Sequence, residues 1–234
     1  MSEPAGRVVV VTGAAGSAGF AATRALRSAG ATVVAVGHSP DRLAALADDI
    51  PGISTEAADL ADLSAVQDLA TRVRERHGGV DGLVHLVGGY RGGDGFASNT
   101  EDDWRFLSSA LIDTLRHVTL SFHDDLVRSA AGRAVIVSAR AAEAPTAGSA
   151  NYATAKAAAE AWMLALADSF RTSAPHGAAT IFVIKALVDQ RMRAQAPNRK
   201  FPGFTDVDDL AARIVGLWSM DAEACNGARI ALDT

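Results

Sequence analysis

A tyrosine and a lysine stand four residues apart where residues 151–156 read NYATAK. In a helix, residues at this spacing lie on one face, so we expect the Lys156 ammonium beside the Tyr152 phenol. A nearby positive charge favours the ionised phenol and lowers its pKa from about 10 by roughly one to three units. The pair would then be a general acid and base usable near neutral pH. Taken alone, the same spacing also describes an ordinary exposed helix face.

A glycine-rich turn near the N-terminus has the composition of a phosphate-binding loop. Residues 12–19 read TGAAGSAG, directly after an apolar run and before a helical stretch. Gly13, Gly16 and Gly19 leave room for the backbone to approach a pyrophosphate, and the free N–H groups at the start of the next helix would face the anion. A turn without a ligand can contain the same glycines. The position between a strand and a helix favours nucleotide binding.

The residues after the second apolar run bear on the type of nucleotide. An NAD site usually has an acidic residue there, which binds the ribose 2′-OH. Residues 37–39 of this chain instead read GHS, without an acid. His38, Ser39 and Arg42 could contact a 2′-phosphate, so we favour NADP(H) over NAD(H). The alternative is that His38 is a solvated loop residue.

The elements that must position these motifs follow a regular alternation of apolar runs and alanine-rich stretches. Near-continuous apolar runs are typical of strands covered on both faces. The predicted strands are Arg7–Val11, Thr32–Val36, Ile53–Ala57, Gly82–Leu86, Ala134–Ser138, Ala179–Ile184 and Arg229–Leu232. The predicted helices are Ala18–Ser28, Pro40–Asp49, Leu63–His77, Glu101–Ala130, Tyr152–Arg171 and Asp206–Ser219. This pattern predicts an α/β fold, a single doubly wound Rossmann domain over residues 1–234 with a seven-stranded parallel sheet and helices on both faces.

Two irregular segments, residues 88–100 and 186–205, are expected to form the substrate loops above the carboxyl ends of the strands. Tyr90 and Arg91 in the first segment are candidate substrate contacts. His85 and Lys185, at the ends of the fourth and sixth predicted strands, would lie near the same site. For both we keep a second interpretation, a hydrogen-bonded structural histidine and a solvated lysine.

The composition excludes several classes of function. Of the 234 residues, 49% are hydrophobic and 21% are charged, as in ordinary globular proteins. The net charge of −5 leaves no basic surplus for binding nucleic acid or an anionic membrane. With Cys225 as the single cysteine, an internal disulfide and a multi-cysteine zinc site are impossible, and no metal is expected. No signal peptide and no membrane-spanning apolar run is evident, which predicts a cytoplasmic protein.

Taken together, these motifs resemble the short-chain dehydrogenase/reductase family over nearly the whole chain. The resemblance rests on residues 12–19, Asp59-Leu60 after the third predicted strand, Gly88 after the fourth, and the pair Tyr152 and Lys156. It implies hydride transfer between a nicotinamide and a small-molecule carbonyl or alcohol. Tyr152 would protonate the carbonyl oxygen, and Lys156 would hold the nicotinamide ribose and lower the Tyr152 pKa. It also implies a homodimer or homotetramer. Besides this pair, the implied cofactor contacts are Gly13, Ala15, Gly16, Ser17, Ala18, Gly19, Gly37, His38, Ser39, Asp59, Leu60, Val87, Gly88, Gly89, Lys185, Leu187 and Val188.

The chain departs from the family pattern at several positions. Ser17 replaces the middle glycine of the turn, and residues 85–88 read HLVG in place of Asn-Asn-Ala-Gly. Leu111 stands near the position of the helix asparagine that holds a proton-relay water in the family. The position of the catalytic serine falls on Ala139, and Ser138, one residue earlier, is the candidate substitute.

Some departures resemble dihydropteridine reductase and its bacterial relatives, a branch that keeps the tyrosine and lysine but lacks the serine. The matching stretches are residues 88–93, 138–142 and 188–192, and Lys185-Ala186 replaces the family's Pro-Gly. The candidate substrate contacts are Tyr90, Arg91, Ala139 and Arg140.

The leading hypothesis is an NADP(H)-dependent reductase of a small carbonyl or quinonoid substrate, because activated substrates need less help from a serine. The first alternative is a family member with non-redox chemistry, such as a dehydratase, cyclase or isomerase. The second is a nucleotide-binding protein without catalysis, since a fold alone does not set a function.

Overall fold

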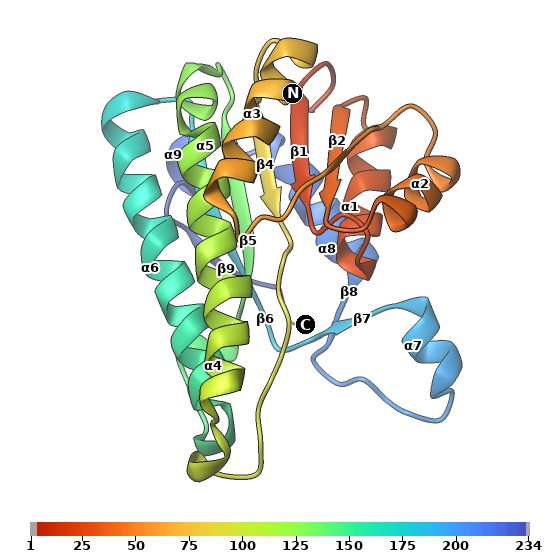
Figure 1. The fold of residues 1–234 in the computed structure, drawn as a ribbon, viewed down its shortest axis with the longest axis vertical. Helices are drawn as coiled ribbons and strands as arrows, with labels where there is room; N and C mark the ends of the chain where they lie inside the picture. The colour runs from red at the N-terminus through yellow and green to blue at the C-terminus, as the bar shows by residue number, and fades with distance from the viewer. Residues whose placement is uncertain (1–3, 233–234) are drawn as a thin grey trace.

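The computed structural model describes residues 4–232, and its main sheet joins seven parallel strands in the order β3-β2-β1-β4-β5-β6-β9 (Figure 1). These strands are β1 (Val8–Thr12), β2 (Thr32–Gly37), β3 (Ser54–Ala57), β4 (Gly82–His85), β5 (Arg133–Ala139), β6 (Ala178–Ile184) and β9 (Arg229–Ala231). Each predicted strand agrees with an observed one to within one residue at either end. The predicted α/β fold with a seven-stranded parallel sheet is confirmed.

Helices cover both faces of the sheet. The longer ones are α1 (Ser17–Ser28), α2 (Pro40–Asp49), α3 (Leu63–His77), α4 (Glu101–Ser108), α5 (Thr114–Arg128), α6 (Ala150–Ser173) and α8 (Val207–Gly216). Buried side chains of α1, α2 and α8 share one hydrophobic cluster with the sheet, and those of α3, α5 and α6 share another. The sheet is therefore buried on both sides, which is the reason that its strands read as continuous apolar runs.

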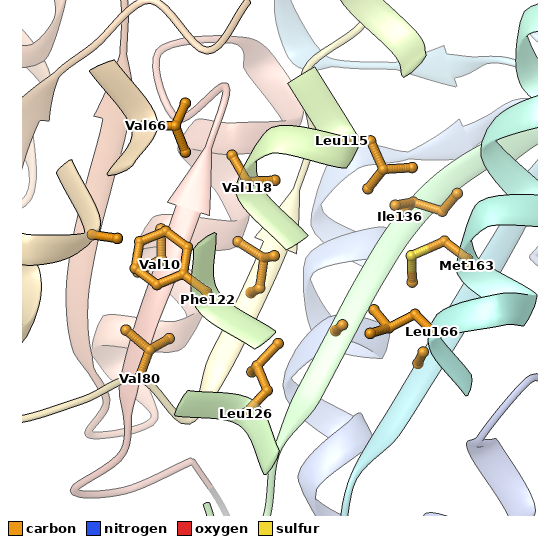
Figure 2. Close-up of a cluster of buried hydrophobic side chains, with 14 of the residues drawn as sticks. Val10, Val66, Val80, Leu115, Val118, Phe122, Leu126, Ile136, Met163 and Leu166 are labelled. Atoms are coloured by element: carbon orange, nitrogen blue, oxygen red, sulfur yellow. The ribbon is translucent and has the colours of Figure 1, made fainter. Parts of the chain in front are cut away.

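Strand β1 shows how the two clusters divide the side chains. Val10 belongs to the cluster with α3, α5 and α6, whereas Val9 and Val11 belong to the cluster with α1, α2 and α8. Successive side chains of a strand point to opposite faces, so one apolar run serves both cores. Figure 2 shows Val10 beside Phe122 of α5, with Met163 and other side chains of α6 continuing the same core.

The predicted helix over residues 101–130 is observed as one helical stretch over residues 101–128 that contains an unpredicted π-helical turn. This turn, Ser109–Asp113, joins α4 to α5 with helical backbone on both sides. A π turn accommodates one extra residue and is frequent at functional sites. The turn contains Leu111, the residue near the expected relay asparagine, and Thr114 directly after it lines a cavity described below.

Residues 186–205 are more regular than predicted. They contain β7 (Leu187–Val188) and α7 (Gln190–Gln195), and β8 (Thr205–Asp206) pairs with β7 in a two-stranded sheet. Figure 1 shows that α7, within this segment, lies away from the main sheet. A short helix, α9 (Ala222–Cys225), also follows α8 where none was predicted. Among residues 4–232, no helix combines the length and apolar composition needed to cross a membrane.

Candidate active site

The strand order reverses at β1, which lies between β2 and β4, and ligands bind at such a switch point in open α/β sheets. Two cavities adjoin there. We call the first the glycine-turn cavity; it has about 460 Å³ and is lined by Gly13 and Gly16. The second, the tyrosine cavity, has about 770 Å³ and is lined by Tyr152 and Lys156. Residues 86–88 line both cavities, so the predicted nucleotide turn and the predicted acid–base pair face neighbouring cavities.

The three glycines of the turn have different roles. Gly13 has a positive φ of 72°, and a Cβ there would lie 2.7 Å from the Leu86 carbonyl oxygen. A Cβ on Gly19 would lie 2.2 Å from the Gly13 oxygen, so packing of α1 against the turn requires this glycine. Gly16 precedes α1 in an extended conformation and has ordinary space around it. In the described structure no side chain caps α1 and its first turn has no acid, so its N–H groups are suited to an anion.

The other end of the glycine-turn cavity is lined by His38, Ser39 and Arg42. Ser39 caps α2 by accepting a hydrogen bond from the Arg42 N–H, and the Arg42 guanidinium donates to the Ala15 carbonyl. That contact ties the helix after β2 to the glycine turn. Asp59 lines the same cavity, where its side chain accepts from the N–H of Ala61.

Helix α6 places the tyrosine and the lysine on one face, as predicted. The Lys156 Nζ atom donates to the Val137 carbonyl at 2.7 Å and lies 5.8 Å from the centre of the Tyr152 ring. The Tyr90 ring meets the Tyr152 ring edge-on, with the centroids 5.0 Å apart. The loop residue Tyr90 therefore covers part of the candidate catalytic side chain.

The electrostatics of the pair differ from the prediction. Burial, followed by the nearby Tyr90, raises the pKa of Tyr152 to about 12, where we expected Lys156 to lower it. Burial lowers the pKa of Lys156 to about 8. Loss of solvent disfavours the charged form of either group, and it is the largest cause of both pKa shifts. At neutral pH Tyr152 is thus a protonated phenol beside a charged lysine.

Ser138, the candidate substitute for the missing serine, is buried and its hydroxyl is already engaged. Its Oγ atom donates to Oε1 of Glu160 at 2.5 Å, and Oε2 of Glu160 accepts from Arg229 at 2.9 Å. Ser138 and Ala139 both line the tyrosine cavity. Because the Ser138 proton points to Glu160, this serine can offer a ligand only its oxygen lone pairs.

His85 is a hydrogen-bonded histidine of the core that also lines the tyrosine cavity. The Thr114 hydroxyl donates to the Ala110 carbonyl at 2.9 Å, so its oxygen accepts from His85 Nε2 at 3.2 Å. His85 Nδ1 then accepts from the Thr12 hydroxyl at 2.8 Å. Burial, and secondarily the Lys156 charge, lower the pKa of His85 to about 3. The neutral imidazole joins β1, β4 and α5, which agrees with the structural interpretation.

Leu111 fills the position near which the family pattern has an asparagine. Its side chain is buried in a small cluster with Leu107 and Ala155, and Tyr152 packs against this cluster. The side of Tyr152 that faces the π turn is therefore apolar.

The loop of residues 88–100 is tied to the segment that precedes α6. The Gly93 N–H donates to the Gly148 carbonyl at 2.8 Å, and the Asn99 side chain donates to the Ala147 carbonyl at 2.8 Å. Arg91 points elsewhere, because it stacks on Phe106 and pairs with Asp103 at 3.2 Å. The loop thus forms a fixed wall of the tyrosine cavity.

Most predicted site residues line one of the two cavities. In the glycine-turn cavity are Gly13, Ala15, Gly16, Gly37, His38, Ser39, Asp59, Leu60, Val87 and Gly88. In the tyrosine cavity are Ala18, Val87, Gly88, Gly89, Tyr90, Ser138, Ala139, Arg140, Tyr152, Lys156, Lys185 and Leu187. Four predicted residues line neither of them, namely Ser17, Gly19, Arg91 and Val188. Gly19 and Val188 are buried, and Arg91 is held by Phe106 and Asp103.

Other residues line the cavities without having been predicted. Phe106, Ser109, Ala110 and Thr114 reach the glycine-turn cavity from α4, the π turn and α5. Thr146 and Ser149 reach the tyrosine cavity from the segment before α6. The first four depend on the π turn, for which the sequence has no signal that we can identify. No cluster of three metal-binding side chains occurs within the described part of the chain.

Comparison with known proteins adds a family match. A family model described as short chain dehydrogenase matches residues 7–199. The chain is 30% identical over 158 residues to the 2,3-dihydro-2,3-dihydroxybenzoate dehydrogenase of Bacillus subtilis (strain 168), covering 66% of this chain and 60% of that relative. It is 30% identical over 169 residues to the acetoacetyl-CoA reductase of Allochromatium vinosum, covering 69% and 68%. The chain therefore spans less than two thirds of the Bacillus relative.

Solved structures share the fold over almost the full length. A short chain dehydrogenase from Burkholderia cenocepacia J2315 in complex with NADP has a TM-score of 0.81 and 25% identity, covering 97% of this chain and 96% of that one. A short chain dehydrogenase from Shigella flexneri 2a str. 301, complexed with NADP, has a TM-score of 0.86 and 20% identity, covering 99% of both. The latter likeness shows the fold alone.

Proposed function

The chain belongs to the short-chain dehydrogenase family, and we propose that it is an NAD(P)-dependent oxidoreductase that reduces a small carbonyl or quinonoid substrate with NADP(H). The observation that carries the proposal is that the two cavities adjoin at residues 86–88, which line both. A dinucleotide has two halves, and the adjoining cavities offer room for both. The acid–base pair lies in the second cavity, where a substrate would meet the reactive half.

The residues of the glycine-turn cavity fit a phosphorylated dinucleotide. The close approach at Gly13 leaves no room for a side chain, and the uncapped start of α1 is suited to a pyrophosphate. His38 and Arg42, rather than an acid, line the cavity beyond β2. This supports NADP(H) over NAD(H), and the NADP complex of the Burkholderia protein supports the same choice.

The chain's own residues supply the proton for reduction. When bound, the nicotinamide supplies the hydride that adds to the carbonyl carbon. Tyr152, with its pKa raised to about 12, keeps its proton at neutral pH and can donate it to the carbonyl oxygen. The Lys156 ammonium is fixed by the Val137 carbonyl close to the phenol, where its charge favours the phenolate left by proton transfer.

Cofactor titration and one substitution test this proposal. Fluorescence titration should show that NADPH binds more tightly than NADH. Tyr152→Phe should retain NADPH binding but lose turnover of a carbonyl panel, because the phenylalanine ring cannot donate a proton. The variant Tyr90→Phe, on the neighbouring ring, is the matched control and should retain proton donation. Failure to bind either cofactor, or unchanged turnover by Tyr152→Phe, would contradict the proposal.

A non-redox reaction in the same site is the second candidate. It is favoured by Ala139, which lacks a hydroxyl for orienting a carbonyl, and by the donation of the Ser138 proton to Glu160. A product that requires Tyr152 but forms without a change in nicotinamide absorbance would support it. The dihydropteridine-reductase-like branch, the single-domain boundaries, a homodimer or homotetramer and a cytoplasmic location stay predictions.

A further inference from the structure

Helix α6 carries a third ionisable side chain on the face of Tyr152 and Lys156. Glu160 follows Lys156 by four residues, the spacing that places helix side chains next to each other. Its side chain is only 14% exposed. One carboxylate oxygen accepts from Ser138 at 2.5 Å and the other accepts from Arg229 at 2.9 Å. Both oxygens accept hydrogen bonds, which is the arrangement of an ionised carboxylate.

Among the groups around Lys156, Glu160 is the one whose negative charge acts on the ammonium. On α6, Tyr152 is a neutral phenol at physiological pH because burial raises its pKa to about 12, and the Tyr90 ring packs against it from the loop. From β4, His85 is neutral because burial lowers its pKa to about 3. From β5, the Val137 carbonyl accepts from the ammonium.

The other charged groups near this face are three basic residues and one exposed acid. Lys185 and Arg140 line the same cavity, and Arg229 on β9 contacts both Glu160 and the exposed Glu143. On the side of the π turn, Leu111 and Leu107 are apolar. A buried ammonium without a counter-charge tends to lose its proton. Burial does lower the pKa of Lys156, and the charge of Glu160 acts in the opposite direction.

We propose that Glu160 is a positioning residue of this site, whose charge supports the Lys156 ammonium one helical turn away and whose carboxylate holds the Ser138 hydroxyl. Through Ser138, the carboxylate is tied to β5 one residue beyond the carbonyl that binds Lys156. Through Arg229, it is tied to the edge strand β9. In the family pattern an asparagine supplies a polar group near the position of Leu111, whereas here the polar groups are Ser138 of β5 and Glu160 of α6. The catalytic consequence rests on the function proposed above, whereas the charge coupling does not.

The sequence allows a direct test, because its only lysines are Lys156, Lys185 and Lys200. Lysine labelled with ¹³C at Cε should give three resonances, and Lys185→Gln and Lys200→Gln assign two of them. The titration of Lys156 is then followed by NMR in the intact protein. We expect Glu160→Gln, which keeps the shape of the side chain, to lower the midpoint by about one pH unit.

Glu143 provides a matched control. It pairs with the same arginine, Arg229, at 2.8 Å, but its side chain is 74% exposed, and the Ser138 hydroxyl donates to Glu160 instead. Glu143→Gln removes the same charge from the same network, and the Lys156 midpoint should stay at the wild-type value. Glu160→Asp, which retains the charge, should keep the midpoint nearer to wild type than Glu160→Gln does.

Three outcomes would overturn the inference: an unchanged midpoint in Glu160→Gln, equal shifts in Glu160→Gln and Glu143→Gln, or equal shifts in Glu160→Gln and Glu160→Asp. Near-ultraviolet circular dichroism checks that each variant is folded. If the enzyme is a reductase, the alkaline limb of its kcat/KM profile should move with the NMR midpoint. If no substrate is turned over, the function proposed above fails, and the NMR titration still decides the role of Glu160.

Discussion

Substituting alanine at Gly13 and at Gly78 distinguishes two costs. One is the steric conflict of a side chain with a neighbouring main chain, and the other is the strain of a positive φ. Gly13 has φ +72° and a Cβ there would lie 2.7 Å from the Leu86 carbonyl oxygen. Gly78, which ends α3, has φ +81°, and a Cβ there would have no neighbouring atom of the described chain within 4 Å. An alanine in the left-handed region costs about 1–2 kcal/mol, so Gly78→Ala should lower the free energy of unfolding by that amount.

The same substitution at Gly13 adds a steric conflict with main-chain atoms. Overpacking of a tight contact costs typically about 1–3 kcal/mol, so we expect Gly13→Ala to lose about 2–5 kcal/mol in total. The peptide that must move belongs to residues 86–88, which line both cavities. Gly13→Ala should therefore also weaken NADPH binding, whereas Gly78→Ala should not.

Urea unfolding followed by tryptophan fluorescence measures the first effect, because Trp218 is buried in the core. Titration with NADPH measures the second. Equal destabilisation by the two alanines, together with equal NADPH affinity, would refute the argument that Gly13 is required by close approach to the β4 loop.

Two further predictions concern the cofactor and the core histidine. Arg42→Gln should weaken NADPH binding about tenfold through loss of a charge-assisted contact and leave NADH binding unchanged, as fluorescence titration can show. The pKa of His85 falls from 6.5 to about 3 on folding, so only the unfolded chain binds its proton in that window and stability falls as the pH falls. His85→Asn should show a smaller acid loss in urea titrations, and an equal loss would contradict a neutral buried imidazole.

The fold was predictable because the sequence patterns that indicate its strands, turns and helices each span only a few neighbouring residues. In β1 and β4, the residues before the terminal Thr12 and His85 lack polar side chains whichever face they point to, since helices cover both faces of the sheet. Such strands appear as unbroken runs, and the glycine at position 13 marks the turn between the first run and its helix. The π turn at Ser109–Asp113 was missed because its one extra residue leaves no mark in the apolar pattern.

The candidate site was predicted as a set of residues but not as an electrostatic arrangement. Helical spacing alone brought Tyr152 and Lys156 to one face of α6. The direction of the Tyr152 pKa depends on burial and on Tyr90, a residue far away in the sequence. The hydrogen bond from Ser138 to Glu160 likewise joins β5 to α6, and no sequence pattern around either residue indicates the other as its partner.

The amino-acid sequence by itself determined the order of strands and helices, the glycine turn and the spacing of the predicted acid–base pair, since each depends on neighbours within a few residues. Only the tertiary structure decided which side chains of the site are charged and which are neutral. The desolvation of Lys156, the neutrality of His85 and the partners of Glu160 arise where distant segments exclude water together. Charge in a protein depends on surrounding solvent and dipoles, and these are assembled only when the chain has packed.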